Sequence, residues 1–221
     1  MTSLGGISVP SARLIYRGAE ADVYLGPWCG GKAVFKFRKK LEYRLDVLDR
    51  AIRTQRTVHE SDMIHRVKAA GVPSPFLYFV DPRESLLVME YVEGVRMKDV
   101  VSTSPPATSL PLFRKLGGMV ATLHANGIMH GDLTTSNVIV DGGRMVMVDF
   151  GLSITTSRVE DQAVDLRLIK ETITGAHSEV AQDALKSLFE GYEAVAGERT
   201  FRSVARQLKD IERRGRYARV E

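Results

Sequence analysis

Two short segments of the sequence carry oxygen-bearing side chains beside apolar runs. The first reads HGDLTTSN and contains His130, Asp132 and Asn137, and the second reads MVDFGLS and contains Asp149. Between them, NVIVD and RMVMVDF have the composition of two strands, joined by a turn signal at Asp141-Gly142-Gly143. Because a hairpin of this length brings its ends together, we expect the two acids and the amide to form one cluster.

Such a cluster has a definite chemistry. Carboxylate and amide oxygens suit Mg²⁺, which proteins commonly hold with one or two carboxylates plus substrate phosphates. One acid can instead accept the proton of a hydroxyl group. Taken singly, each residue also has a purely structural interpretation, since Asp and Asn often cap turns and helices.

The order and spacing of these residues resemble the protein-kinase superfamily. His130, Asp132 and Asn137, followed by Asp149-Phe150-Gly151, match the catalytic loop and the metal-binding loop of kinases. In the same comparison, AVFK places Lys36 where kinases pair a lysine with phosphates. Glu60, in the following helical segment, takes the place of the carboxylate that holds that lysine.

The kinase resemblance implies ATP and Mg²⁺ as cofactors, with Asp132 as the catalytic residue and Asn137 and Asp149 as metal ligands. VMEYVEG resembles the hinge that contacts adenine through its backbone. The residues expected to bind the nucleotide are Gly18, Glu20, Val23, Val34, Lys36, Glu60, Met89, Glu90, Tyr91, Val92, Asn137 and Asp149.

The sequence also departs from the kinase pattern. The glycine-rich loop is reduced to GAEADVYLG, with Gly18 alone before Glu20, so fewer backbone N–H groups can cover phosphates. Gly131 replaces the arginine of the H-R-D motif, and Thr134 stands where Ser/Thr kinases have a lysine. SRVEDQAVDL follows the DFG motif directly, which predicts an almost complete loss of the activation segment and of its peptide-binding platform.

This set of departures resembles one family, the small atypical kinase of the KEOPS complex, called EKC in eukaryotes. The similarity covers nearly the whole chain and lies in GAEADVY, YRLDVLDRAIRTQRTVHE, HGDLTTSN, DFGLS, DQAVDL and the basic RGR near the end. A lysine usual in the family before the Tyr-Arg pair is Leu41 here, with Lys39 and Lys40 just upstream.

The resemblance implies a Ser/Thr kinase or ATPase that supports threonylcarbamoyladenosine modification of tRNA at position 37. It also implies two protein partners, the KEOPS threonylcarbamoyl-transferase subunit and a small KEOPS subunit. We expect tRNA to contact the basic tail, because residues 202–221 contain seven Lys/Arg and three acids. Arg213, Arg214, Arg216 and Arg219 are dense there, Gly215 is expected to break the helix, and Tyr217 could stack on a base.

The predicted fold class is α+β, a two-lobed kinase-like fold with a β-rich N-lobe and a reduced, mainly helical C-lobe without an activation segment. The expected N-lobe is residues 1–92 and the expected C-lobe is residues 93–221. In the N-lobe, Asp46 to Ala70 has helical spacing and suggests two helices. In the C-lobe, 101–110 is expected to be a connection, Pro111 to begin a helix, and Asp165 to support the catalytic loop through its backbone.

Composition narrows the class of protein. The chain has 221 residues, 26% of them charged, and its single Cys29 excludes an internal disulfide. No apolar run approaches the roughly 20 residues that cross a bilayer, and the first residues lack the pattern of a secretion signal. We therefore expect a cytoplasmic protein without a membrane association.

Two other functions remain open at this stage. A small-molecule kinase of the aminoglycoside or choline type also uses H-G-D-x-x-x-x-N, but it normally carries a larger, acid-rich helical domain after the DFG motif. A nucleotide-binding scaffold with little catalysis is the other alternative, although the presence of Lys36, Glu60, Asp132, Asn137 and Asp149 together argues against it.

Overall fold

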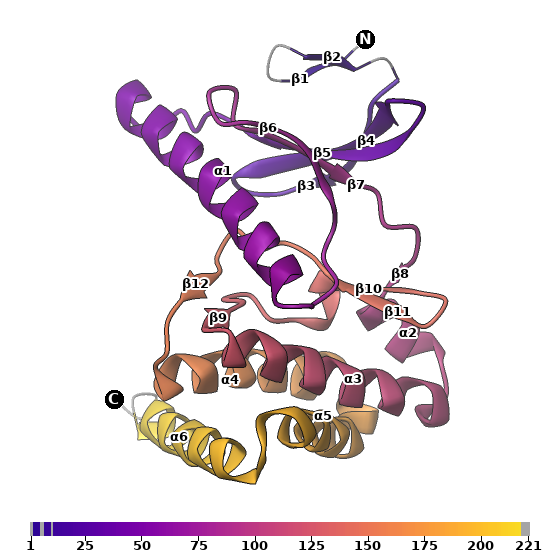
Figure 1. Cartoon of the computed structure of the whole chain (residues 1–221), viewed down its shortest axis with the longest axis vertical. Coiled ribbons are helices and arrows are strands. Elements are labelled where there is room, and N and C mark those ends of the chain that lie inside the picture. Colours follow the sequence, from indigo (N-terminus) through magenta and orange to yellow (C-terminus); the bar gives the residue numbers. More distant parts are fainter. Residues whose placement is uncertain (1, 5–6, 10, 218–221) are drawn as a thin grey trace. The chain divides into compact units, whose positions relative to one another are not determined.

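The computed structural model of the chain describes residues 2–4, 7–9 and 11–217. These residues form two compact units (Figure 1). The first unit contains residues 1–66 and 74–93, and the second contains residues 67–73 and 94–221. Strands dominate the first unit and helices the second, so the mixed α and β class expected from the sequence is confirmed.

The first unit is built on an antiparallel sheet of five strands in the order β3-β4-β5-β7-β6. Its strands are β3 (Arg13–Arg17), β4 (Ala21–Trp28), β5 (Gly31–Arg38), β6 (Leu77–Asp81) and β7 (Leu86–Glu90). Alternation along β5 buries Ala33 and Phe35 on one face, where they pack with Leu86 and Val88. A separate two-stranded ribbon, β1 (Thr2–Leu4) with β2 (Ile7–Val9), precedes this sheet.

One long helix, α1 (Asp46–Ala69), accompanies the sheet (Figure 1). The sequence suggested two helices here, and that expectation is wrong. The segment contains neither glycine nor proline, so nothing in its backbone interrupts the helix. The break comes at Gly71, which has a φ of 83° that favours glycine.

The second unit combines short strands with a helical layer. Its first part consists of β8 (Val95–Arg96), α2 (Met97–Thr103), α3 (Pro106–Ala125), β9 (Ile128–Met129), η1 (Thr135–Asn137), β10 (Val138–Asp141), β11 (Arg144–Met147) and β12 (Ile154–Thr155). The predicted hairpin is present as β10 and β11, with Val138 opposite Met147. The second ribbon pairs β12 with β9.

Helix α3 begins earlier than the sequence suggested. Residues 101–110 are not a plain connection, since α2 runs to Thr103 and α3 starts at Pro106. Pro106 stands in the first turn, where its missing N–H has no helical partner to lose. Pro111 therefore lies inside the helix and is exposed at its surface, one turn from the start.

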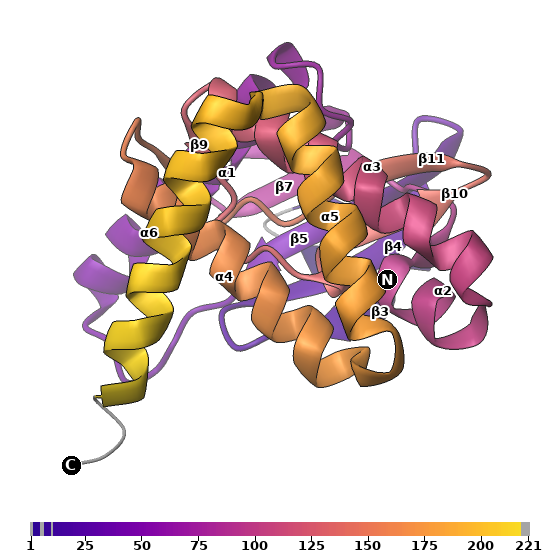
Figure 2. The same cartoon turned by 90° about the horizontal axis from the view of Figure 1, so that it is seen from below.

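The last part of the unit is helical, with α4 (Val159–Ala176), η2 (Ser178–Val180), α5 (Ala181–Ala196) and α6 (Glu198–Tyr217). Figure 2 shows this helical layer, in which α5 packs against α3 and α6 packs against α4 and α5. Helices α3 and α5 approach closely because both have glycine at the contact. A Cβ atom on Gly117 would lie 1.9 Å from the Leu188 carbonyl oxygen, and one on Gly191 would lie 1.8 Å from that of Arg114.

Helix α6 continues through Gly215, so the predicted break at that residue is wrong. Helices α5 and α6 are separated at Gly197, which has a φ of 80°. Arg219 lies outside the described residues. Among the described residues no helix is long and apolar enough to cross a membrane.

Candidate functional site

The loop that contains Asp132 is held at its start by Asp165 of α4. The buried Asp165 carboxylate accepts hydrogen bonds from the backbone N–H of His130 at 2.5 Å and of Gly131 at 2.8 Å. His124 Nε2 lies 3.4 Å from the same carboxylate, and its Nδ1 lies 2.9 Å from the Tyr192 hydroxyl. The predicted supporting role of Asp165 is therefore confirmed. The side chains of His124 and Tyr192 continue the hydrogen-bond network from its carboxylate.

His130 anchors the loop in the core of the second unit. Its side chain is fully buried, and its ring lies 4.9 Å from that of Phe150, centre to centre. Ser153 Oγ donates a hydrogen bond to the His130 carbonyl at 3.0 Å. Burial lowers the pKa of His130, although the nearby carboxylates of Asp165, Asp149 and Asp132 act in the opposite direction. His130 is thus a neutral, structural residue that ties the HGD segment to the DFG segment.

Gly131 is required by local geometry. Its φ is 78°, and a Cβ atom there would lie 2.1 Å from the Leu152 carbonyl oxygen. No side chain fits this approach, because the atom in the way belongs to the backbone that leads into β12. The loss of the kinase arginine at this position therefore follows from the close contact between the catalytic loop and the residues after DFG.

Asp132 and Asn137 are joined directly. The Asn137 side-chain amide nitrogen donates to the Asp132 carbonyl and to its Oδ2, both at 2.9 Å. The Asn137 carbonyl accepts the Val148 N–H at 2.9 Å, which extends the β10–β11 ladder to the residue before Asp149. Asp149 is exposed and has a φ of 65°. The hairpin therefore brings the two predicted loops together, as the sequence indicated.

The donor set fits a magnesium ion that also uses phosphate oxygens. With its nitrogen engaged by Asp132, Asn137 has its amide oxygen left as the atom that a metal would use. Within the part of the chain that the structure describes, no group of three or more His, Cys, Asp or Glu side chains could hold a metal alone. One carboxylate and one amide leave most coordination positions to water and phosphate, which is the usual arrangement for Mg²⁺.

Two further contacts, which were not predicted from the sequence, fix the middle of the loop. The buried Thr135 hydroxyl lies 3.0 Å from His177 Nε2, at the end of α4. Arg96 donates to the Ser136 carbonyl at 3.0 Å. Burial lowers the pKa of His177. Only the tertiary structure brings Arg96 and His177 to the loop, because each lies about 40 residues from its partner in the sequence.

In the first unit, Lys36 and Glu60 form the expected ion pair. Lys36 Nζ lies 2.7 Å from Glu60 Oε1, and the Glu60 side chain is 1% exposed. Arg38, which is also buried, binds the other oxygen of the same carboxylate. No role for Arg38 was predicted from the sequence. A signal was available, because a charged residue two positions after Lys36 on a strand shares its face.

Four of the predicted nucleotide-binding residues share one face of the sheet. Val23 lies opposite Lys36 across β4 and β5, and Val34 lies opposite Met89 across β5 and β7. Residues directly opposite in a ladder point to the same side, and so do residues two apart on a strand. Val23, Val34, Lys36 and Met89 are therefore brought together, with apolar side chains around one ammonium group.

The reduced glycine loop is a tight turn between β3 and β4. The Gly18 N–H donates to the Ala21 carbonyl at 2.9 Å, and Lys39 Nζ donates to the Gly18 carbonyl at 2.8 Å. Glu20 is paired with Arg44 at 3.1 Å and also with Arg56. These contacts hold the turn in place, so its backbone is far less free than a glycine-rich loop.

The predicted hinge begins in the last residues of β7 and continues beyond Glu90. The Glu90 N–H is already bonded to the Phe76 carbonyl at 2.8 Å, so it continues the β6–β7 ladder. Val92 is 6% exposed. Lys32 Nζ stands 5.8 Å from the centre of the Tyr91 ring. Because the Glu90 N–H is already bonded, the backbone N–H groups of Tyr91 and Val92 are the hinge candidates for hydrogen bonds to adenine.

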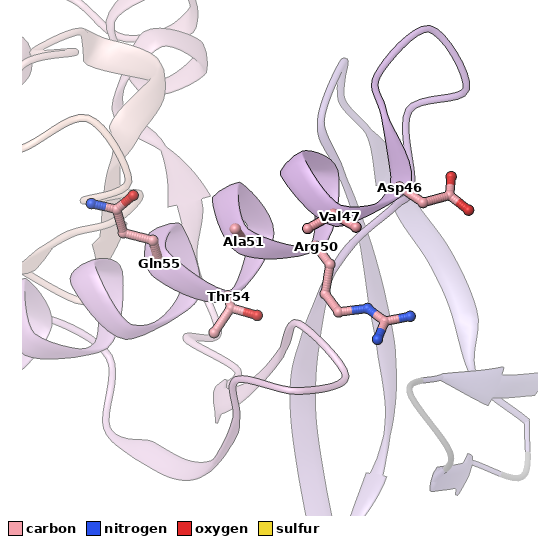
Figure 3. Close-up of a pocket in the computed structure, with 6 residues that line it drawn as sticks. All are labelled: Asp46, Val47, Arg50, Ala51, Thr54 and Gln55. Carbon is pink, nitrogen blue, oxygen red and sulfur yellow. The ribbon is translucent and has the colours of Figure 1, made fainter.

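A hollow of about 570 Å³ lies on α1 (Figure 3). It is lined by Asp46, Val47, Arg50, Ala51, Thr54 and Gln55. None of the residues predicted to bind the nucleotide contributes to it. At 3.6 residues per turn, its lining falls on a different side of the helix from Glu60.

The activation segment is nearly absent, as predicted. After Gly151 the chain forms the two-residue strand β12 and then enters α4 at Val159. The Thr156 hydroxyl donates to Asp161 at 2.8 Å and closes this short connection. Together, the fold and these loops define an atypical kinase, with the lysine pair and the acid loops of a kinase but no peptide platform.

Comparison with known proteins agrees with this class. The family model of the RIO domain matches residues 33–171. The crystal structure of the Rio2 kinase-ADP/Mg²⁺-phosphoaspartate complex from Chaetomium thermophilum superposes with a TM-score of 0.65 at 18% identity. That match covers 95% of this chain and 72% of the other.

Among curated sequences, the KEOPS complex subunit Bud32 of Pyrococcus abyssi is 36% identical over 93% of this chain and 96% of its own length. A probable bifunctional tRNA threonylcarbamoyladenosine biosynthesis protein of Methanothermobacter thermautotrophicus is 36% identical over 97% of this chain. The chain spans only 38% of that relative's length. The chain therefore belongs to the RIO-domain family of atypical kinases and, within it, to the family of the KEOPS subunit Bud32.

Proposed function

We propose that this chain is an ATP- and Mg²⁺-dependent Ser/Thr kinase or ATPase that supports threonylcarbamoyladenosine modification of tRNA at position 37. The observation that carries the catalytic part is the junction of Asn137 with Asp132 beside Asp149. The names of the Pyrococcus and Methanothermobacter relatives support the tRNA-modifying context. A second support is the Lys36–Glu60 pair.

Each residue has a separate role in this proposal. Lys36, oriented by Glu60, binds phosphate oxygens, and the Val23, Val34 and Met89 side chains contact the adenine ring, with Tyr91 and Val92 beside it. Asn137 and Asp149 hold the metal, which supplies charge stabilisation of the transferring phosphoryl group. Asp132 orients the attacking hydroxyl group or water, and its hydrogen bonds from Asn137 fix that orientation.

The two structural units correspond, in this proposal, to the N-lobe and C-lobe of a kinase, with the boundary near residue 93. The proposed partners are the KEOPS threonylcarbamoyl-transferase subunit and a small KEOPS subunit. tRNA contacts the basic tail that begins at Arg213. The proposed location is the cytoplasm.

The decisive test is Asp149→Ala, assayed for Mg²⁺-dependent ATP hydrolysis with the partner subunits present. Loss of a metal ligand removes several kcal/mol of charge stabilisation, so we expect turnover to fall by about 100-fold or more. Asp183→Ala is the matched control, because Asp183 is an exposed carboxylate on α5 with no ion pair among the described residues. Unchanged turnover in Asp149→Ala would refute the assignment and favour a nucleotide-binding scaffold.

A further inference from the structure

Helix α6 carries a one-sided distribution of charge. It packs on α4 and α5, and Val204 and Leu208 are buried at 0% and 5% exposure. Figure 2 shows α6 at the near side of the second unit, in front of α4. The outward side of the helix carries a row of exposed basic side chains, Arg199, Arg202, Arg206, Lys209 and Arg213, here called the α6 basic row.

The spacing of the α6 basic row makes it continuous. Its members follow one another at intervals of three or four residues, which places them on one side of an α-helix, opposite the buried Val204 and Leu208. With a rise of 1.5 Å per residue, the row extends for about 21 Å along the axis. Adjacent cations are separated by about 4.5 to 6 Å of helix rise.

The charge of this row is only partly neutralised. Arg202 pairs with Glu198 at 2.5 Å, and Arg213 pairs with Asp210 at 3.4 Å. Arg199, Arg206 and Lys209 form no ion pair or hydrogen bond through their side chains with any residue that the structure describes. Arg199, Arg206 and Lys209 thus face solvent without an ion-pair partner in the described part of the chain.

The helix itself does not benefit from these charges. Cations stabilise the C-terminal turn of a helix and destabilise the N-terminal turn, because the macrodipole is positive at the N-terminus. Arg199 and Arg202 lie in the first turns of α6, where their charge opposes the dipole. Stabilisation of the helix dipole can therefore account only for the basic residues near Arg213, in the last turns of α6.

We propose that the α6 basic row binds the phosphate backbone of RNA, with tRNA as the ligand; this rests on the proposed role in tRNA modification. A straight row of cations fits a ligand with regularly repeated negative charges. Four of the five residues are arginines, whose planar guanidinium groups bind phosphates with two hydrogen bonds. Contacts from such cations to phosphates position an RNA backbone and do not depend on its base sequence. It lies on the described helix and joins the tail at Arg213.

The test compares two charge-matched triple variants of the 221-residue chain. Arg199→Gln/Arg206→Gln/Lys209→Gln removes the three cations of the row that have no ion pair within the described part of the chain. Arg83→Gln/Lys98→Gln/Lys186→Gln removes three exposed cations elsewhere and serves as the control. Binding of fluorescently labelled tRNA is measured by anisotropy over a range of KCl concentrations, and ATP hydrolysis without RNA is measured in parallel.

We expect the row variant to lose about ten- to hundredfold in tRNA affinity at low salt. Each lost phosphate contact reduces the slope of log K against log[KCl] by about 0.7 to 0.9, so the slope becomes flatter by about two to three. The control keeps the wild-type slope, and both variants keep the basal ATP hydrolysis. The proposal is overturned if the two variants lose affinity equally, or if the row variant binds tRNA like the wild type.

Two additional measurements distinguish the row from the tail and RNA from an acidic protein. If only deletion of residues 215–221 weakens tRNA binding, the RNA contact belongs to the tail and the row proposal is wrong. If polyglutamate displaces labelled tRNA as well as unlabelled tRNA does, the row is a site for an acidic protein and the proposal is again wrong. A failure of the proposed catalytic function would appear differently, as absent ATP hydrolysis in the wild type with the tRNA results unchanged.

Discussion

At the scale of single residues, the Glu60 carboxylate is the centre of the first unit's charged site. It is shared by Lys36 and Arg38, so two cations depend on one buried anion. Arg38 Nε has no hydrogen-bond partner among the described residues, which leaves Glu60 as the main compensation for a buried guanidinium group. Lys36 is the more exposed cation, with a side chain 12% exposed against 7% for Arg38. We infer that Arg38 fixes Glu60, and that Lys36 is the cation of the two that reaches phosphate.

This arrangement predicts an asymmetry between two substitutions. Glu60→Gln should lower the free energy of unfolding by about 3 to 5 kcal/mol, because two buried cations would lose their counter-charge. Lys36→Met should cost much less, since Arg38 still compensates Glu60, yet it should abolish ATP turnover. Urea denaturation followed by circular dichroism measures both stabilities. Equal destabilisation by the two substitutions would show that Arg38 does not hold the carboxylate.

At the scale of elements, two antiparallel ribbons and one helix position the acidic residues of the second unit. The β9–β12 ribbon fixes the start of the catalytic loop, and the β10–β11 hairpin fixes its end relative to Asp149. Helix α4 supplies Asp165, whose carboxylate binds two consecutive backbone N–H groups of the loop. The loop is thus held by backbone contacts, which explains how it keeps its shape without an activation segment.

The close approach of the catalytic loop to the residues after DFG predicts that Gly131 tolerates no side chain. Gly131→Ala should cost several kcal/mol, because its Cβ would lie 2.1 Å from the Leu152 carbonyl oxygen, and it should also lower ATP turnover. Gly142→Ala is the matched control, with a φ of 50° and no atom within 4 Å of the added Cβ. It should cost only about 1 to 2 kcal/mol, the strain of a left-handed residue. Thermal unfolding and ATPase assays distinguish the two, and an equal cost would mean that the loop moves aside freely.

At the scale of the whole molecule, the connection from Gly151 to α4 leaves no segment that phosphorylation could order. In kinases that segment controls the site and presents the peptide substrate. Its near absence, together with the exposed apolar side chains of Leu152 and Ile154 at 58% and 47% exposure, is consistent with control by a bound partner. The family of this chain is named for a subunit of a complex, which fits the same view.

Control by a partner predicts that ATP hydrolysis depends on assembly. The isolated chain should hydrolyse ATP about 5- to 150-fold more slowly than the chain assembled with its partner subunits, the usual range of coupling between sites. Steady-state ATPase assays at equal chain concentration measure the ratio. As a control, Asp149→Ala should remain inactive in both states, which excludes a contaminating ATPase. Equal rates for the isolated and assembled chain would contradict partner control.

The sequence by itself determined the class of protein and indicated most residues of the candidate site. Asp132, Asn137, Asp149, Lys36 and Glu60 were recognisable because kinase chemistry demands these residue types in a set order, and the hairpin signal between the two loops is local. A local turn signal also located the β10–β11 hairpin. Local signals failed at Pro111 and Gly215, because neighbouring residues with helical propensity outweigh a single residue that is typical of a helix boundary.

Only the tertiary structure decided which groups share a partner. Arg38 on the Glu60 carboxylate, His177 on Thr135, and the absence of space at Gly131 all depend on segments far apart in the chain. Periodicity and turn chemistry describe neighbours within a few residues, whereas these contacts arise when separate elements pack at close range. For that reason the residue types of the site could be predicted from the sequence, and the interactions that orient them could not.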